Sequence, residues 1–323
     1  RRFSMGKGNA AVKQWMSNRV RYADLFNGTV FQGKQMIMPE DLEPAETEAD
    51  ILVSDKGGKT KEVRRHRDIV MRWKKGIELV LLACENQEKI HYAMPVRNML
   101  YDGLTYTEQI RCIHELHKKD DKKNITGDEF LSRFQKTDKL YPVITVVLYY
   151  GEKEWDGSVD LYGLFHEETM FRENKILQQY IPNYRINLIE PGNMDNVDMF
   201  RTDLQEVFGM LRYRSNKTEL VKYVKDKEEY FQNVDAETYY VIREFLHSEK
   251  VLKTITNNRE ERVDLCKALQ DLYDEGIEQG FEQGKESEKI SIAKKFLKIL
   301  DPETVAENVE LPLEVVLGLK EEK

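Results

Sequence analysis

The stretch Glu62–Gln109 decides the fold, and it reads EVRRHRDIVMRWKKGIELVLLACENQEKIHYAMPVRNMLYDGLTYTEQ. Ile77–Cys84 is an apolar run with a single charge, Glu78, and such a run is typical of a strand buried on both faces. Val63–Trp73 is rich in β-branched and aromatic residues, and Lys75-Gly76 suits a two-residue hairpin loop. The stretch therefore predicts an antiparallel hairpin inside a sheet.

The expected loop fixes which residues face each other across this hairpin. With Lys75-Gly76 as the loop, Asp68 lies opposite Ala83, and Asp68, Glu85 and Gln87 point to the same face. Two carboxylates ~4 Å apart repel each other by ~4 kcal/mol at an effective dielectric constant of ~20. A divalent cation would remove this cost, and oxygen ligands favour Mg²⁺ or Mn²⁺. The alternative is that both acids are solvated or paired with nearby arginine or lysine side chains.

Three segments resemble the Rpn family of recombination-promoting nucleases and transposases, which belongs to the PD-(D/E)XK nuclease superfamily. They are ENQEKIHYAMPVRNMLYDGLTYTEQI, RYADLFNGTVFQGKQMIMPEDL and DKLYPVITVVLYYGEKEWDGS, and the resemblance extends roughly over residues 7–284. It implies an α/β fold with an αβββαβ core, followed by a helical region. It also implies Asp68 and Glu85 as metal ligands and Gln87 as a catalytic residue. Gln87 stands at the position of the superfamily's lysine, although glutamine is common there in this family.

Further candidates lie before and within the motif stretch. A helix over Ala10–Phe26, ended by Asn27-Gly28, could lend Asp24 to the metal site, and a solvated or capping aspartate is the alternative. On a strand, Arg64 and His66 would share the face of Asp68 and could contact DNA phosphates. Protection of an exposed strand edge is the alternative for these basic residues.

A helix over residues 96–117 supplies the other candidates for DNA contacts. Arg97 and Tyr101 fall on one helical face, and His91 precedes the helix, so Arg97 and His91 could meet a phosphate or assist proton transfer. A solvated arginine and a structural histidine are the alternatives. The helical periodicity rests on apolar side chains at five positions: Met99, Leu100, Tyr106, Ile110 and Ile113.

The composition limits the possible functions but does not identify one. The chain has 323 residues, 33% of them charged and 40% hydrophobic, which is typical of a globular protein. A net charge of −8 argues against broad electrostatic binding of nucleic acid, but it is compatible with a local basic surface. Three widely separated cysteines without metal-ligand spacing, and the lack of a signal peptide or an apolar span, lead us to expect a cytoplasmic protein with no membrane partner.

We expect three parts in the chain: a nuclease-like core over residues 5–192, a helical accessory region over 193–273, and a tail over 274–323. The core should contain a second buried strand at residues 142–149, PVITVVLY. Four helices are expected in the accessory region, over Met199–Leu211, Lys217–Gln232, Ala236–His247 and Asn258–Tyr273.

The tail repeats glycine every four residues, at Gly276, Gly280 and Gly284. These glycines could permit close contact between helices of two subunits and so a homo-oligomer, or they could mark a fraying segment. Three short helices should follow, over Ile290–Leu300, Pro302–Val309 and Leu313–Leu319.

The function expected from these features is metal-dependent cleavage of DNA phosphodiester bonds with Mg²⁺ or Mn²⁺ as cofactor. The alternative is a DNA-binding or self-assembling module on the same fold with little or no cleavage. Gln87 in place of lysine and the acidic net charge leave this alternative open.

Overall fold

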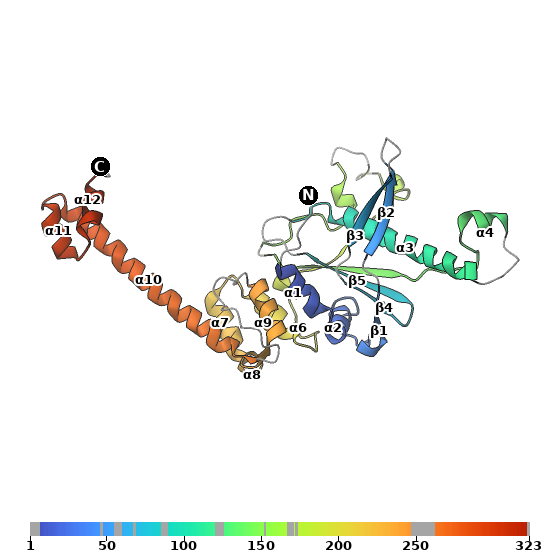
Figure 1. Ribbon diagram of the computed structural model, residues 1–323, viewed down its shortest axis with the longest axis horizontal. Coiled ribbons are helices and arrows are strands. Elements are labelled where there is room, and N and C mark those ends of the chain that lie inside the picture. The colour runs from blue at the N-terminus through green and yellow to red at the C-terminus, as the bar shows by residue number, and fades with distance from the viewer. Residues whose placement is uncertain are drawn as a thin grey trace.

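The computed structural model describes residues 7–45, 48–54, 60–66, 69–84, 90–119, 126–151, 153–166, 171, 174–246 and 262–321. In the described residues, the main sheet has five strands in the order β1-β4-β5-β6-β7 (Figure 1). They are β1 (Leu42–Pro44), β4 (Ile69–Trp73), β5 (Ile77–Cys84), β6 (Val143–Tyr149) and β7 (Asn187–Ile189). Strands β1, β4 and β5 are antiparallel neighbours, whereas β6 runs parallel to β5 and β7 parallel to β6. The apolar run 77–84 thus forms a strand inside the sheet, as the sequence predicts.

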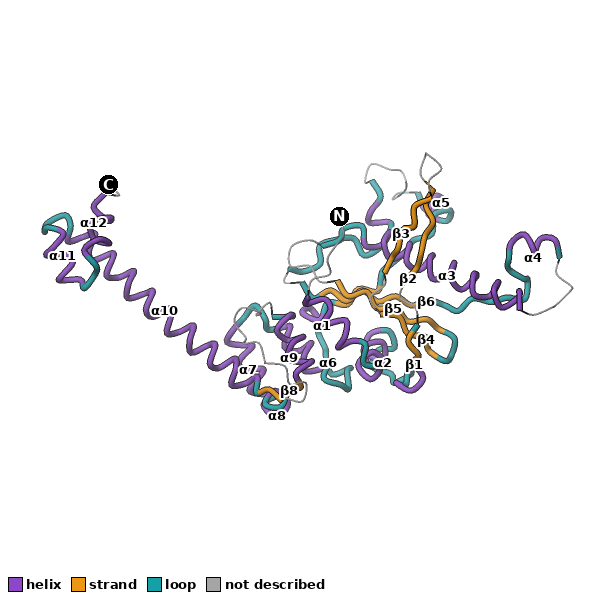
Figure 2. Tube along the Cα trace, in the orientation of Figure 1, coloured by secondary structure: helices purple, strands orange, loops and turns teal. Residues whose placement is uncertain are grey.

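The strand expected over Val63–Trp73 is wrong, because the chain forms two strands there. β3 (Thr60–His66) pairs with β2 (Glu48–Ser54) in a separate two-stranded sheet, and β4 belongs to the main sheet. Figure 2 shows β2 and β3 standing apart from the main sheet, and β2 contacts the long helix α3 (Met94–Lys119). Strand propensity is similar on both sides of the break, so propensity alone does not separate the two strands.

The hairpin loop between β4 and β5 has three residues instead of the two predicted. Trp73 pairs with Ile77, so Lys74, Lys75 and Gly76 form the loop, and Gly76 has a φ of 82°. A three-residue loop that ends in a left-handed glycine is a common hairpin connection. The register of β4 against β5 is therefore shifted by one residue from the prediction.

The expected helix over residues 10–26 is two helices, α1 (Lys7–Met16) and α2 (Arg19–Thr29). Asn18 ends the first and caps the second, since its side chain accepts a hydrogen bond from Val20 N. Asn27-Gly28 does not end α2. Instead, Asn27 is buried and binds the backbone of Met36 and Ile37, while Gly28 packs against the ring of Phe200.

Helix α3 connects the ends of the two parallel strands β5 and β6 and contacts β6. Short elements complete this part of the chain. They are α4 (Gly127–Ser132), α5 (Lys175–Gln178), and the single-turn helices Pro39–Asp41, Tyr162–Leu164 and Pro191–Asn193. The order of α2, three antiparallel strands, α3 and a parallel strand equals the αβββαβ order that the resemblance implies, with the β2–β3 hairpin inserted after β1.

The helices after β7 share the hydrophobic core of α1, α2 and the sheet. They are α6 (Leu204–Arg212), α7 (Lys217–Asp226), α8 (Glu228–Phe231) and α9 (Ala236–Phe245), and β8 (Val234–Asp235) pairs with β9 (Arg262–Val263). Phe208 of α6 and Phe245 of α9 belong to the same buried cluster as Trp15. The indole of Trp15 also donates a 2.9 Å hydrogen bond to Thr238 Oγ1, which ties α1 to α9.

A 32-residue helix, α10 (Leu265–Phe296), leads to a small unit formed with α11 (Pro302–Val309) and α12 (Leu313–Glu321) (Figure 1). This unit has its own cluster of buried residues, Ala293, Val305, Val309 and Val316. The glycine-spaced segment is continuous helix, and residues 290–296 belong to α10 rather than to a separate short helix. None of the described helices has both the length and the apolar character that a membrane span needs.

Candidate nuclease site and its surroundings

The edge at which β4 begins and β5 ends adjoins the predicted metal ligands. Ile69 pairs with Leu81, and β5 continues to Cys84, which pairs with Tyr149 at the end of β6. In the chain, Asp68 directly precedes β4 and Glu85 directly follows β5. Because β4 and β5 are antiparallel, the start of one and the end of the other lie at the same edge.

Asp68, Glu85 and Gln87 themselves lie outside the described residues, so their roles stay predictions. The two-residue loop that predicted a shared face for them is wrong, as the register shows. Within the described part of the chain, no group of three histidine, cysteine or acidic side chains could hold a metal ion.

Arg64 and His66 lie on β3, outside the main sheet. In the register of the small sheet, Arg64 stands opposite Asp50 and His66 opposite Glu48. The predicted continuity of these residues with β4 is wrong, while their contact with DNA stays a prediction.

His91 and Arg97 lie at the start of α3. His91 is exposed, and its carbonyl accepts a hydrogen bond from Met94 N at 2.8 Å. The Arg97 guanidinium lies 5.5 Å from the centre of the Tyr101 ring, which confirms that these two residues share a helical face. Arg97 is in the first turn of the helix that follows the motif, where the helix dipole also favours an anion.

The carboxylate of Asp24 accepts hydrogen bonds from within the fold. This side chain is 4% exposed and accepts hydrogen bonds from the backbone N–H groups of Arg201 and Thr202 and from the Thr202 hydroxyl, at 2.6–3.0 Å. Asp24 thereby holds the segment before α6 against α2. These contacts favour the capping alternative over a metal ligand.

A partly buried polar network joins α3 to the sheet. Oδ1 of Asp102 accepts from the Thr145 hydroxyl and Oδ2 accepts from the Tyr184 hydroxyl, both at 2.5 Å, and Asn98 donates to Tyr184 at 2.8 Å. Burial raises the pKa of Tyr184, and so do the hydrogen bond to Asp102 and the negative charge of that carboxylate. The network thus places the Tyr184 hydroxyl, the Asp102 carboxylate and the Asn98 amide between the first turns of α3 and the sheet.

Sequence reasoning missed this network because it considered only the apolar side chains of α3 in the helical periodicity. Met99 and Leu100 are in fact 40% and 43% exposed, while Asn98 is buried. The buried polar side chains of α3 are Asn98, Thr105 and Gln109, which recur at helical spacing. That polar periodicity was the available signal.

Aromatic and charged side chains also surround the end of β6. Tyr149 stacks edge-on against Trp155 with ring centroids 5.2 Å apart, and burial raises the pKa of Tyr149. The Arg214 guanidinium donates to the carbonyls of Tyr150 and Gly151. Arg214 therefore fixes the chain where β6 leaves the sheet, at the edge shared with the end of β5.

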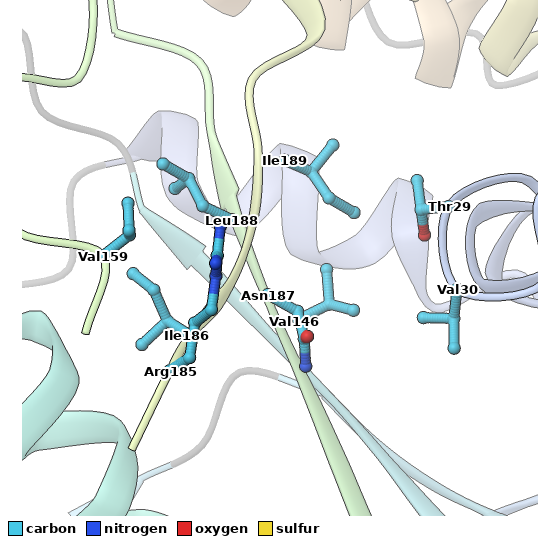
Figure 3. Close-up of a pocket in the computed structure, with 9 residues that line it drawn as sticks. All are labelled: Thr29, Val30, Val146, Val159, Arg185, Ile186, Asn187, Leu188 and Ile189. Carbon is cyan, nitrogen blue, oxygen red and sulfur yellow. The ribbon is translucent and has the colours of Figure 1, made fainter. Parts of the chain in front are cut away.

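A cavity of about 510 Å³ lies beside the outer strand β7 (Figure 3). It is lined by Thr29, Val30, Val146, Val159, Arg185, Ile186, Asn187, Leu188 and Ile189. The lining contains neither an acid nor a histidine, so it lacks the groups that metal-dependent hydrolysis needs. The cavity is distinct from the predicted site.

Comparison with known proteins supports the resemblance seen in the sequence. The family model described as "Putative transposase, YhgA-like" matches residues 127–240, from α4 through β6 and β7 into α9. This segment does not include Asp68, Glu85 or Gln87. No curated protein and no solved structure matches the chain. The resemblance to a transposase family is thereby confirmed over residues 127–240.

Proposed function

We propose that this chain is a metal-dependent DNA endonuclease of the recombination-promoting, transposase-like type. One observation carries the proposal: the strands that adjoin Asp68 and Glu85 are antiparallel neighbours, and their adjoining ends lie at one sheet edge. The αβββαβ order of elements and the family match over residues 127–240 support it.

The donor chemistry at this edge fits a hard divalent cation. Asp68 and Glu85 would supply carboxylate oxygens, which Mg²⁺ and Mn²⁺ prefer. Such an ion, when bound, stabilises charge on a phosphate and lowers the pKa of a bound water. Gln87 would orient the phosphate or the attacking water by neutral hydrogen bonds. Arg97, in the first turn of α3, would contribute positive charge to DNA binding.

A plasmid-nicking assay with Mg²⁺, Mn²⁺ or EDTA tests this proposal. The parent should nick DNA with either metal and not in EDTA, while Asp68→Asn and Glu85→Gln should abolish nicking. Glu88→Gln is the matched control, because it removes a carboxylate three residues from Glu85, outside the motif. Circular dichroism should show that all three variants keep the fold of the parent. Equal nicking by Asp68→Asn, Glu85→Gln and the parent would exclude this site.

Gln87 provides a second test of the same site. Gln87→Ala should reduce the cleavage rate by about 10²-fold, the scale for loss of one preorganised donor. Gln87→Lys restores the superfamily's charge but repels the cation, so the metal concentration needed for half-maximal cleavage should change. If both variants cut like the parent across a metal titration, Gln87 has no catalytic role.

The alternative is a DNA-binding or assembly module with negligible cleavage. Gln87 at the lysine position and the net charge of −8 leave this alternative open. DNA retention in a mobility-shift assay, without nicking in either metal, is the result that selects this alternative over the endonuclease.

A further inference from the structure

Among the described elements of the chain, none packs against the middle of α10. α10 contacts α7 and α8 near its start and α11 and α12 near its end, and Figures 1 and 2 show no other element beside its middle. In this middle part, Ile277 and Phe281 are 54% and 61% exposed. They are four residues apart, so they form an apolar stripe on one helical face.

Glycines next to this stripe have no role within the chain. A Cβ atom added at Gly280 or Gly284 would meet nothing within 4 Å. Glycine weakens the interior of an exposed helix, and neither residue is needed for packing inside the chain. A second helix lying on the stripe would explain both, because a missing side chain lets two backbones come close.

The charges along α10 identify the occupant of the stripe. Residues 264–282 contain six acids and one lysine, whereas residues 283–298 contain five lysines and two acids. A second copy of the helix in antiparallel orientation would place each acidic half against a basic half. A parallel copy would place like charges together, and this is unfavourable.

We propose that α10 pairs with α10 of a second copy of this chain, antiparallel, about a two-fold axis between Phe281 and Glu282. Such an axis brings the two Phe281 side chains together and places Asp274 of one copy level with Lys289 of the other. Asp274 is exposed, and Lys289 is half-buried with its Nζ 3.0 Å from Glu310 Oε2 of its own chain. Both flank the stripe on the same side, and a two-fold axis maps that side onto itself. The charge pair therefore occurs twice in the dimer.

The proposal is independent of the proposed nuclease activity and is tested on the full chain by sedimentation equilibrium over a range of protein concentrations. The parent should be a dimer in reversible equilibrium with monomer. Phe281→Glu should raise the dimer dissociation constant by about 30-fold or more, as for a central aromatic contact. Phe130→Glu is the matched control, because Phe130 is a 70% exposed helical phenylalanine on α4. It should leave the dissociation constant unchanged.

Charge exchange tests the orientation. Asp274→Lys and Lys289→Asp should each weaken the dimer by about 5-fold, since each affects two symmetry-related charge pairs. The double variant should restore the parent's dissociation constant. A monomeric parent at all concentrations, or a dimer unaffected by Phe281→Glu, overturns the proposal. A double variant no tighter than either single variant overturns the antiparallel register.

Discussion

The Tyr184 hydroxyl donates a 2.5 Å hydrogen bond to Oδ2 of Asp102, and this contact ties α3 to the chain just before β7. Oδ1 of the same carboxylate accepts from Thr145 on β6. One half-buried acid therefore fixes the helix that follows the predicted motif against β6 and the segment before β7. In the proposed endonuclease, this network would set the position of Arg97 without touching DNA.

Removal of the Tyr184 hydroxyl should destabilise the protein and change its response to alkali. Tyr184→Phe leaves Asp102 and Asn98 each short of one partner, so the free energy of unfolding should fall by about 1–3 kcal/mol at neutral pH. The folded state raises the pKa of Tyr184 above its ordinary value of 10.0. The stability that this shift contributes is fully present below pH 10.0 and is lost as the pH rises through the folded-state pKa.

Urea unfolding at several values between about pH 8 and about pH 11 measures this effect. The parent should lose more stability over this range than Tyr184→Phe does. Tyr180→Phe is the control, because Tyr180 is 79% exposed, and it should follow the parent. The same loss in all three proteins would show that Tyr184 does not link stability to pH.

Two glycines in helices should respond to alanine in opposite directions. A Cβ at Gly28 would lie 2.5 Å from Cε1 of Phe200, a buried ring packed edge-on against Phe208. Gly28→Ala should therefore lower the free energy of unfolding by about 1–3 kcal/mol. A Cβ at Gly103, inside α3, would meet nothing within 4 Å. Gly103→Ala should raise stability by up to about 1 kcal/mol, and thermal unfolding of both variants checks the difference in sign.

The sequence predicts those strands whose apolar residues are consecutive in the chain. The apolar runs at 77–84 and 143–149 are neighbouring parallel strands inside the sheet, and such runs are typical of strands covered on both faces. Asn27-Gly28 shows the limit of local signals. The pair has the composition of a helix end, but a distant phenylalanine and a neighbouring loop determine its role.

The candidate site is predicted only in part, for a related reason. Its strands and their order follow from local patterns, but the register depends on whether Lys74 is paired or belongs to the loop. Both loop lengths suit a glycine at position 76, so composition does not choose between them. The buried polar positions of α3 recur at helical spacing, which is a local signal, but a partner such as Tyr184, to which Asn98 donates, is distant in the sequence.

Arg21 joins α2 to the helices that follow β7, and its geometry should matter more than its charge. Its guanidinium binds both carboxylate oxygens of Asp203 at 2.8–2.9 Å and lies 3.3 Å from Glu237. Lysine keeps the charge but cannot donate two parallel hydrogen bonds to the Asp203 carboxylate. Arg21→Lys should therefore lower the free energy of unfolding by about 1–3 kcal/mol. Arg19→Lys, at an exposed position of the same helix, should change it little. Equal effects of the two changes in urea unfolding would contradict this role.

Asp24→Asn distinguishes a structural acid from a metal ligand in the proposed endonuclease. The backbone N–H groups of Arg201 and Thr202 and the Thr202 hydroxyl all donate to this buried carboxylate. The asparagine amide has the same shape as the aspartate carboxylate but no charge. Its NH₂ group would also face the N–H and O–H groups that donate to Asp24. The free energy of unfolding should therefore fall by about 1–3 kcal/mol.

The Mg²⁺ concentration for half-maximal nicking should stay at the parent's value, measured at a temperature where Asp24→Asn is folded. Asp195→Asn, at an exposed acid in the segment before α6, should change neither stability nor the Mg²⁺ requirement. The opposite pattern in Asp24→Asn, with unchanged stability and a higher Mg²⁺ requirement, would identify Asp24 as a metal ligand. Its carboxylate would then have to exchange the N–H donors of residues 201 and 202 for the cation.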